Sequence, residues 1–166
     1  MKSLEARFEE AIHFLCMCMK DLKNSPKPTI FHSIRVGTYL YNNNYNDDVV
    51  LAGLLHDVIE DTVITKEIIE EKFNATIAKM VMANSRDSSI DNKKHAQAEL
   101  ITRCILSGKN ATIIKAADIL DNYIYYKRIQ KESGILYCFE NAEILFKHLP
   151  NDFSDKVFDE LKLIHK

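Results

Sequence analysis

The chain has 166 residues, 46% of them hydrophobic, and its 22 Lys and Arg against 24 Asp and Glu give a formal net charge of −2 at pH 7. This length supports one substantial core but no series of catalytic and regulatory domains, so we expect residues 1–166 to form a single domain. The slightly negative charge excludes a general attraction to nucleic acid polymers, which bind through a concentrated basic surface.

The composition favours helices. Only four Gly and three Pro occur, and Leu, Ile, Lys, Glu and Ala are frequent, which disfavours a turn-rich β fold. In the first half of the chain, apolar residues recur at helical spacing and predict helices at residues 4–20, 30–41, 49–59, 65–73 and 75–84. Pro26 and Pro28, within segment 24–28, end the first helix, and Asp47 and Thr65 can cap the third and the fourth.

The second half of the chain continues this pattern. Helices are predicted at residues 93–107, 111–127, 132–148 and 153–165. Residues 85–92 are expected to form a loop, because Ser, Arg, Asp and Asn cluster there with little periodicity, and Gly108-Lys109-Asn110 separates two helices. The predicted fold class is therefore all-α.

No cysteine framework or targeting signal is recognised. Cys16, Cys18, Cys104 and Cys138 form no CxxC pair, so we expect reduced thiols rather than disulfides or a zinc knuckle. The apolar run 14–19 is far shorter than a membrane span and lacks a cleavage-site pattern. We therefore expect a cytoplasmic protein with no membrane partner.

The most informative segment is LLHDVIEDT at residues 54–62. His56 and Asp57 offer an imidazole nitrogen and a carboxylate oxygen to one metal ion, but two ligands hold a divalent cation poorly, so distant segments must complete the shell. Glu60 and Asp61 follow four residues later, and in a continuous helix they project from the same surface. Such polar groups among apolar neighbours are costly to bury unless they bind something.

Two distant residues can complete this shell, because His32 lies upstream and Asp118 downstream, each within a predicted helix. The order of His32, the HD pair and Asp118 resembles that of the HD-domain metal-dependent phosphohydrolases, a helical superfamily with a mononuclear two-His, two-Asp metal site. The resemblance covers about residues 30–126 and implies a single-domain HD-type helical bundle.

Two strings resemble one branch of that superfamily more closely. HDVIEDT at residues 56–62 and KAADILDN at residues 115–122 are similar to motifs of the guanosine tetraphosphate hydrolases, meaning the hydrolase half of the RelA/SpoT proteins and their small stand-alone relatives. The chain departs from that branch at Ser33, where a Pro is usual, and at Ile119, where a basic residue usually follows the last metal Asp.

The predicted metal ligands are two imidazoles and two carboxylates, contributed by His32, His56, Asp57 and Asp118. In an octahedral shell these four leave room for a water and a substrate oxygen, which suits Mn²⁺, with zinc, iron and other first-row ions as alternatives.

Glu60 and Asp61 are the predicted catalytic acid and base, which would activate the water and return a proton to the leaving group. The alternative for this pair is solvation at the end of a helix. Predicted contacts to the substrate come from Lys115, Asn122, Arg35, Lys93 and Lys94. Their alternatives are an exposed amide for Asn122 and ordinary solvated charges for the four cations.

Three functions follow from these observations. The resemblance points first to an enzyme that removes the 3′-pyrophosphate from guanosine tetra- or pentaphosphate, a small-molecule nucleotide. A second alternative is a nucleotidase or another nucleotide phosphohydrolase of the same superfamily. The third is a non-catalytic helical module that binds a nucleotide or a metal, although such a module has no need for the second acidic pair. The sequence leaves the oligomeric state open.

Overall fold

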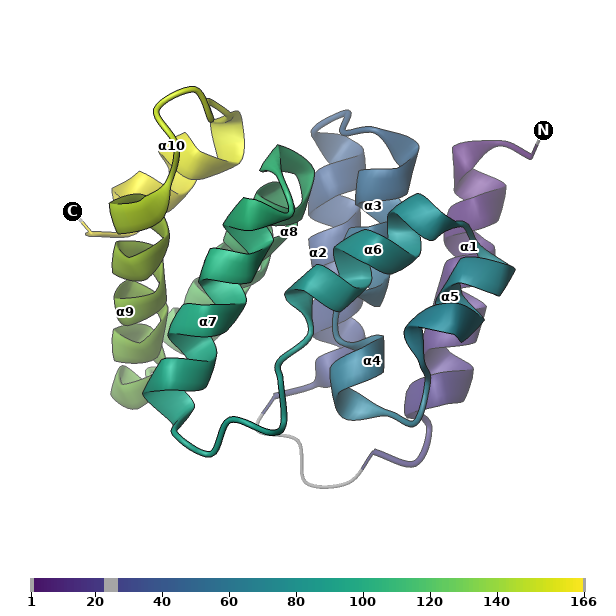
Figure 1. Cartoon of the computed structure of the whole chain (residues 1–166), viewed down its shortest axis with the longest axis horizontal. Helices are drawn as coiled ribbons and strands as arrows, with labels where there is room; N and C mark the ends of the chain where they lie inside the picture. The colour runs from purple at the N-terminus through teal and green to yellow at the C-terminus, as the bar shows by residue number, and fades with distance from the viewer. Residues whose placement is uncertain (1, 23–26, 166) are drawn as a thin grey trace. The chain divides into compact units, whose positions relative to one another are not determined.

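The computed structural model describes residues 2–22 and 27–165, and the regular secondary structure in this part of the chain is helical (Figure 1). The prediction of an all-α fold is confirmed. Residues 24–26, predicted to help end the first helix, lie outside the described residues. Contacts divide the chain into two compact units, Met1–Ser85 and Arg86–Lys166, which we call the N-terminal and C-terminal units. A single domain over residues 1–166 therefore stays a prediction.

The N-terminal unit is built around a short apolar helix. Its helices are α1 (Leu4–Met19), α2 (Thr29–Asn42), α3 (Asp47–Leu55), α4 (Val58–Asp61), α5 (Lys66–Lys72) and α6 (Ala75–Asn84). From Val49 onward every residue of α3 is buried, because α1, α2 and α6 all pack against it. Gly53 allows this close packing, since a Cβ at that position would lie 2.2 Å from Cδ1 of Leu40.

The prediction of one continuous helix over residues 49–59 is wrong. Helix α3 ends at Leu55 and α4 begins at Val58, so His56 and Asp57 form a turn between two helices. At this point the Gly53 carbonyl accepts a hydrogen bond from the ring of His56 at 2.7 Å. A local side-chain bond of this kind competes with the helical pattern.

Two predicted helix caps also differ from the structure. Asn46 caps α3, with its side chain accepting from the amide of Asp48 at 2.9 Å, while Asp47 is the first helical residue. Thr65 precedes α5 as predicted but makes no side-chain cap. The side chain of Asn46 thus takes the capping role that was predicted for Asp47, the residue after it.

The C-terminal unit contains α7 (Lys93–Leu106), α8 (Lys109–Arg128), α9 (Glu132–His148), α10 (Lys156–Lys162) and the 3-10 helix η1 (Leu163–His165). Helices α7, α9 and α10 all contact α8, which supplies a large part of the core. Gly108 connects α7 and α8 at a φ of 110°, which permits α8 to start two residues before the predicted residue 111. The last helix starts later than residue 153, because Asp155 caps it by accepting from the amide of Val157.

None of the helices in the described part of the chain has both the length and the apolar character needed to cross a membrane.

Candidate metal centre

Two histidine rings meet inside the N-terminal unit. His32, on α2, is fully buried, and His56, directly after α3, is 2% exposed. Their Nε2 atoms lie 3.3 Å apart, and the ring planes are inclined at 72°. Because α2 and α3 pack against each other, residues far apart in sequence present the same type of donor atom to one point.

A backbone carbonyl orients His56. Nδ1 of His56 lies 2.7 Å from the carbonyl oxygen of Gly53. Since a carbonyl only accepts hydrogen bonds, Nδ1 carries a proton and donates it, which directs Nε2 toward His32 and Asp57. Histidines that bind metal ions are typically held in this way by a second hydrogen bond. This role of Gly53 is not among the predictions, and its spacing of three residues from His56 is the one signal for it in the sequence.

Asp57 brings a carboxylate to the two rings. Its Oδ1 lies 3.1 Å from Nε2 of His56, and its Oδ2 lies 3.8 Å from Nε2 of His32. Burial works to raise the pKa of Asp57, but His56, Lys27 and His32 outweigh it and hold this pKa below its usual range. The carboxylate therefore stays ionised and able to bind a cation.

The donor set fits a divalent metal ion. Bonds of about 2.1 Å to one ion place neighbouring donor atoms roughly 3.0 to 3.4 Å apart, depending on the coordination angle. The separations between the His32 and His56 nitrogens, 3.3 Å, and between His56 and Asp57, 3.1 Å, fall in this range. Imidazole nitrogen with carboxylate oxygen is a donor combination used by first-row divalent ions.

Glu60 and Asp61 form an exposed acidic pair on α4. Partial removal of the carboxyl group from water, followed by the negative charges of Asp57 and Glu60, raises the pKa of Asp61 to about 6. Lys27 acts in the opposite direction and lowers it. Asp61 can therefore hold or release a proton close to neutral pH, as a catalytic acid or base must. A carboxylate that only solvates the end of a helix has no need of a raised pKa.

Asp118 is held by two side chains of its own helix in the C-terminal unit. Its Oδ2 accepts from Nζ of Lys115 at 2.8 Å, and its Oδ1 accepts from Nδ2 of Asn122 at 2.6 Å. Spacings of three and four residues put all three side chains on one face of α8. This arrangement fixes both oxygens of the carboxylate.

Lys115, Asp118 and Asn122 are all buried. This burial corrects the alternatives of a solvated charge for Lys115 and an exposed amide for Asn122. Lys115, 6% exposed, is not an ordinary surface lysine, and Asn122, 7% exposed, is not an exposed amide. Burial alone would lower the pKa of Lys115, but the charge of Asp118 outweighs burial and raises it, so the ammonium remains charged. The predicted contact of Lys115 and Asn122 with substrate, and that of Asp118 with metal, stay predictions.

The other predicted substrate contacts differ in exposure, since Arg35 is part-buried and both lysines are exposed. The Arg35 guanidinium lies 4.8 Å from the centre of the Phe31 ring. Lys93 and Lys94 are exposed at the start of α7, and Nζ of Lys94 lies 3.7 Å from a carboxylate oxygen of Glu140. Their roles in binding substrate stay predictions.

Comparison with known proteins gives a family and a fold. A family model described as HD domain matches residues 11–145. A guanosine-3′,5′-bis(diphosphate) 3′-pyrophosphohydrolase of Haemophilus influenzae is 29% identical over an alignment of 152 positions that covers 84% of this chain and 22% of the relative. The bifunctional (p)ppGpp synthase/hydrolase SpoT of Escherichia coli is 32% identical over 105 residues, covering 60% of this chain and 15% of the relative. The chain thus spans about a fifth of the length of the Haemophilus influenzae relative and of a second curated relative with the same name, from Aquifex aeolicus.

Two solved structures share the fold. One, described as a metazoan ortholog of SpoT that hydrolyses ppGpp, has a TM-score of 0.78 at 23% identity and covers 99% of this chain and 95% of its own. The other, a protein of Listeria monocytogenes, has a TM-score of 0.67 at 23% identity and covers 86% of this chain and 100% of its own. At this level of identity the likeness concerns the fold.

Proposed function

Because the chain belongs to the HD domain family, we propose that it is a metal-dependent phosphohydrolase that removes the 3′-pyrophosphate from guanosine tetra- or pentaphosphate. The observation that carries this proposal is the pair of buried imidazole nitrogens 3.3 Å apart, with the Asp57 carboxylate beside them. The substrate is proposed because the curated relatives named above bear the name of that activity.

We propose that Mn²⁺ is held by His32, His56 and Asp57, and that Asp118 supplies the fourth ligand. When bound, such an ion acts as a Lewis acid on a phosphoryl oxygen and lowers the pKa of a bound water. Asp118 suits this role because Lys115 and Asn122 already orient its carboxylate. A ligand that is held before the ion arrives loses little conformational freedom on binding it.

The acidic pair on α4 supplies proton transfer in this proposal. Hydrolysis breaks the bond between the 3′ oxygen of the ribose and phosphorus. Water gives its hydroxyl to phosphorus and one proton to the 3′ oxygen, so pyrophosphate is released together with guanosine 5′-diphosphate from the tetraphosphate or guanosine 5′-triphosphate from the pentaphosphate. Asp61, whose pKa is raised to about 6 first by partial burial and then by the charges of Asp57 and Glu60, can take the proton from the water near neutral pH.

The proposal is tested by loading metal-free protein with Mn²⁺, Mg²⁺ or Zn²⁺ and supplying a panel of phosphorylated nucleotides that includes guanosine tetraphosphate. Pyrophosphate and orthophosphate are measured separately. We expect pyrophosphate from guanosine tetraphosphate with Mn²⁺. Release of orthophosphate instead would indicate a nucleotidase, and binding without turnover would indicate a non-catalytic module.

A further inference from the structure

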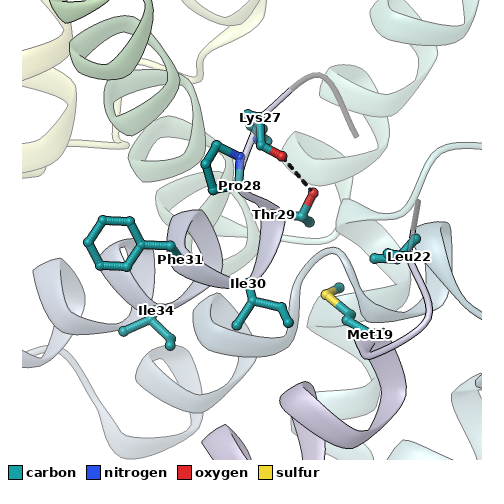
Figure 2. Close-up of a pocket in the computed structure, with 8 residues that line it drawn as sticks. All are labelled: Met19, Leu22, Lys27, Pro28, Thr29, Ile30, Phe31 and Ile34. Atoms are coloured by element: carbon teal, nitrogen blue, oxygen red, sulfur yellow. Dashed lines mark hydrogen bonds between the residues drawn. The ribbon is translucent and has the colours of Figure 1, made fainter. Parts of the chain in front are cut away.

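A pocket of about 430 Å³ lies where the end of α1 meets the start of α2, within the N-terminal unit (Figure 2). Its lining is mostly apolar and includes Met19, Leu22, Ile30, Phe31 and Ile34, and it carries one charged side chain, Lys27. This volume is in the range of sites for small organic ligands, which are typically apolar concavities with a few polar groups.

Phe31 gives the pocket an exposed aromatic ring. The residue is 53% exposed, although it sits in the first turn of α2 beside the fully buried His32. The guanidinium of Arg35, one turn further along the helix, lies 4.8 Å from its ring centre. A planar aromatic ligand could stack on the same ring, and stacking on an aromatic side chain contributes about 1 to 3 kcal/mol for a nucleobase.

One helical turn connects this pocket with the metal centre. Pro28 lines the pocket, and its carbonyl accepts a hydrogen bond from the amide of His32 at 2.9 Å. Lys27, the residue before Pro28, also lines the pocket and supplies a positive charge at this turn. A ligand with a negative group is therefore favoured over a neutral apolar ligand.

We propose that this pocket binds the nucleobase of the substrate, with Phe31 stacking on the base and Lys27 contacting a phosphate. The inference rests on the proposed function, which supplies the class of substrate. It adds the residues that recognise the nucleobase, which takes no part in the reaction. A nucleotide is favoured over an apolar peptide or a lipid tail, because Lys27 in the pocket lining and Arg35, whose guanidinium lies 4.8 Å from the Phe31 ring centre, complement phosphate charge.

Binding to the metal-free full chain tests the proposal without turnover. Guanosine 5′-monophosphate and ribose 5-phosphate share one phosphate and differ in the base, so the ratio of their dissociation constants reports base recognition. We expect the native protein to bind the nucleotide at least about fivefold more tightly, which corresponds to the lower limit of stacking. Phe31→Ala should bring the ratio close to one, and Phe31→Trp should restore it.

Two further variants separate the roles. Lys27→Met should weaken both ligands by a similar factor and leave their ratio unchanged, because it removes a phosphate contact and no base contact. Met82→Ala, at an exposed apolar residue of α6, should change neither constant. Circular dichroism of each variant checks that the helices are retained.

A native ratio of one, or a raised ratio that persists in Phe31→Ala, would overturn the proposal. These outcomes are distinct from failure of the proposed function. Base-dependent binding through Phe31 in a protein that hydrolyses no nucleotide would refute the function and support the pocket. Turnover of guanosine tetraphosphate with base-independent binding would support the function and refute the pocket.

Discussion

His32 and His56 are 24 residues apart in sequence, yet their Nε2 atoms lie 3.3 Å apart in the interior of the N-terminal unit. Because Nδ1 of His56 donates to Gly53, its Nε2 is directed toward Nε2 of His32, and in the neutral form of both rings with Nδ1 protonated each Nε2 carries a lone pair. Two lone pairs at this separation repel each other unless a proton or a cation lies between them. A divalent cation bound by both nitrogens would remove this repulsion, in agreement with the proposed metal site.

Loss of either ring should remove metal binding. His32→Ala and His56→Ala are each expected to weaken Mn²⁺ affinity by more than about 100-fold, because removal even of a group that merely orients a ligand costs about 10- to 100-fold. Metal content after dialysis, measured by atomic emission, checks this. His95→Ala, at an exposed histidine of α7, is the matched control and should keep the native content. Metal binding that survives both variants would contradict the assignment.

The acidic pair should act on turnover and not on metal content. Asp61→Asn and Glu60→Gln are each expected to retain the metal while lowering the turnover number by about 10²- to 10⁴-fold, the usual contribution of a general acid or base. Turnover and metal content are measured on the same samples. Native turnover in both variants would remove the proposed proton transfer.

Asp61 should also make stability depend on pH. Its pKa of about 6 in the folded protein exceeds the ordinary value of 3.8, so between about pH 4 and pH 6 the folded state binds more protons than the unfolded state. The free energy of unfolding therefore loses a contribution as the pH rises through this window. In urea titrations of metal-free protein, Asp61→Asn should gain stability relative to the native chain from pH 4 to pH 6. Parallel stability curves would show that the pKa of Asp61 is not raised.

Lys115 should stabilise the C-terminal unit through Asp118. Lys115→Met leaves a buried carboxylate without its cation and is expected to lower the free energy of unfolding by about 3 to 5 kcal/mol. The double variant Lys115→Met, Asp118→Asn removes the uncompensated charge and should be more stable than Lys115→Met alone. Urea unfolding without metal measures both. If the double variant were the less stable of the two, the 2.8 Å contact would contribute little.

Gly134 should be intolerant of a side chain. A Cβ at this position of α9 would lie 2.3 Å from Cγ of Tyr126, a ring atom next to the backbone that cannot move away alone. Gly134→Ala is expected to lower the free energy of unfolding by about 1 to 3 kcal/mol through overpacking. Ser133→Ala, at the exposed neighbour on the same helix, should change it by less than about 0.5 kcal/mol. Equal effects of the two substitutions would show that α8 and α9 can separate freely here.

Cys104 should be unreactive in the folded protein. Burial raises the pKa of its thiol to about 12, so at pH 8 about one thiol in ten thousand is ionised. Cys16 is exposed and should react with iodoacetamide under the same conditions. Peptide mass spectrometry after native labelling, and again after labelling in urea, distinguishes the two. Similar labelling of Cys104 and Cys16 before unfolding would contradict the buried position.

Local sequence determined most of the helices. The predicted bounds 75–84 and 132–148 agree with α6 and α9, because apolar periodicity and capping depend on residues only three or four positions apart. The sequence also indicated which residue types could hold a metal ion. His and Asp side chains at these spacings, next to apolar residues, are not expected in a purely apolar core. The break between α3 and α4 was not predictable from periodicity, because it accompanies a side-chain bond from His56 to Gly53.

The sequence by itself therefore determined the helical class, the donor types and their order along the chain. The tertiary structure alone decided that His32 meets His56 at 3.3 Å, that Lys115 is buried against Asp118, and that a pocket adjoins Lys27. The physical reason is that helix formation depends on nearby residues, whereas distances between side chains and their burial depend on how helices remote in sequence pack.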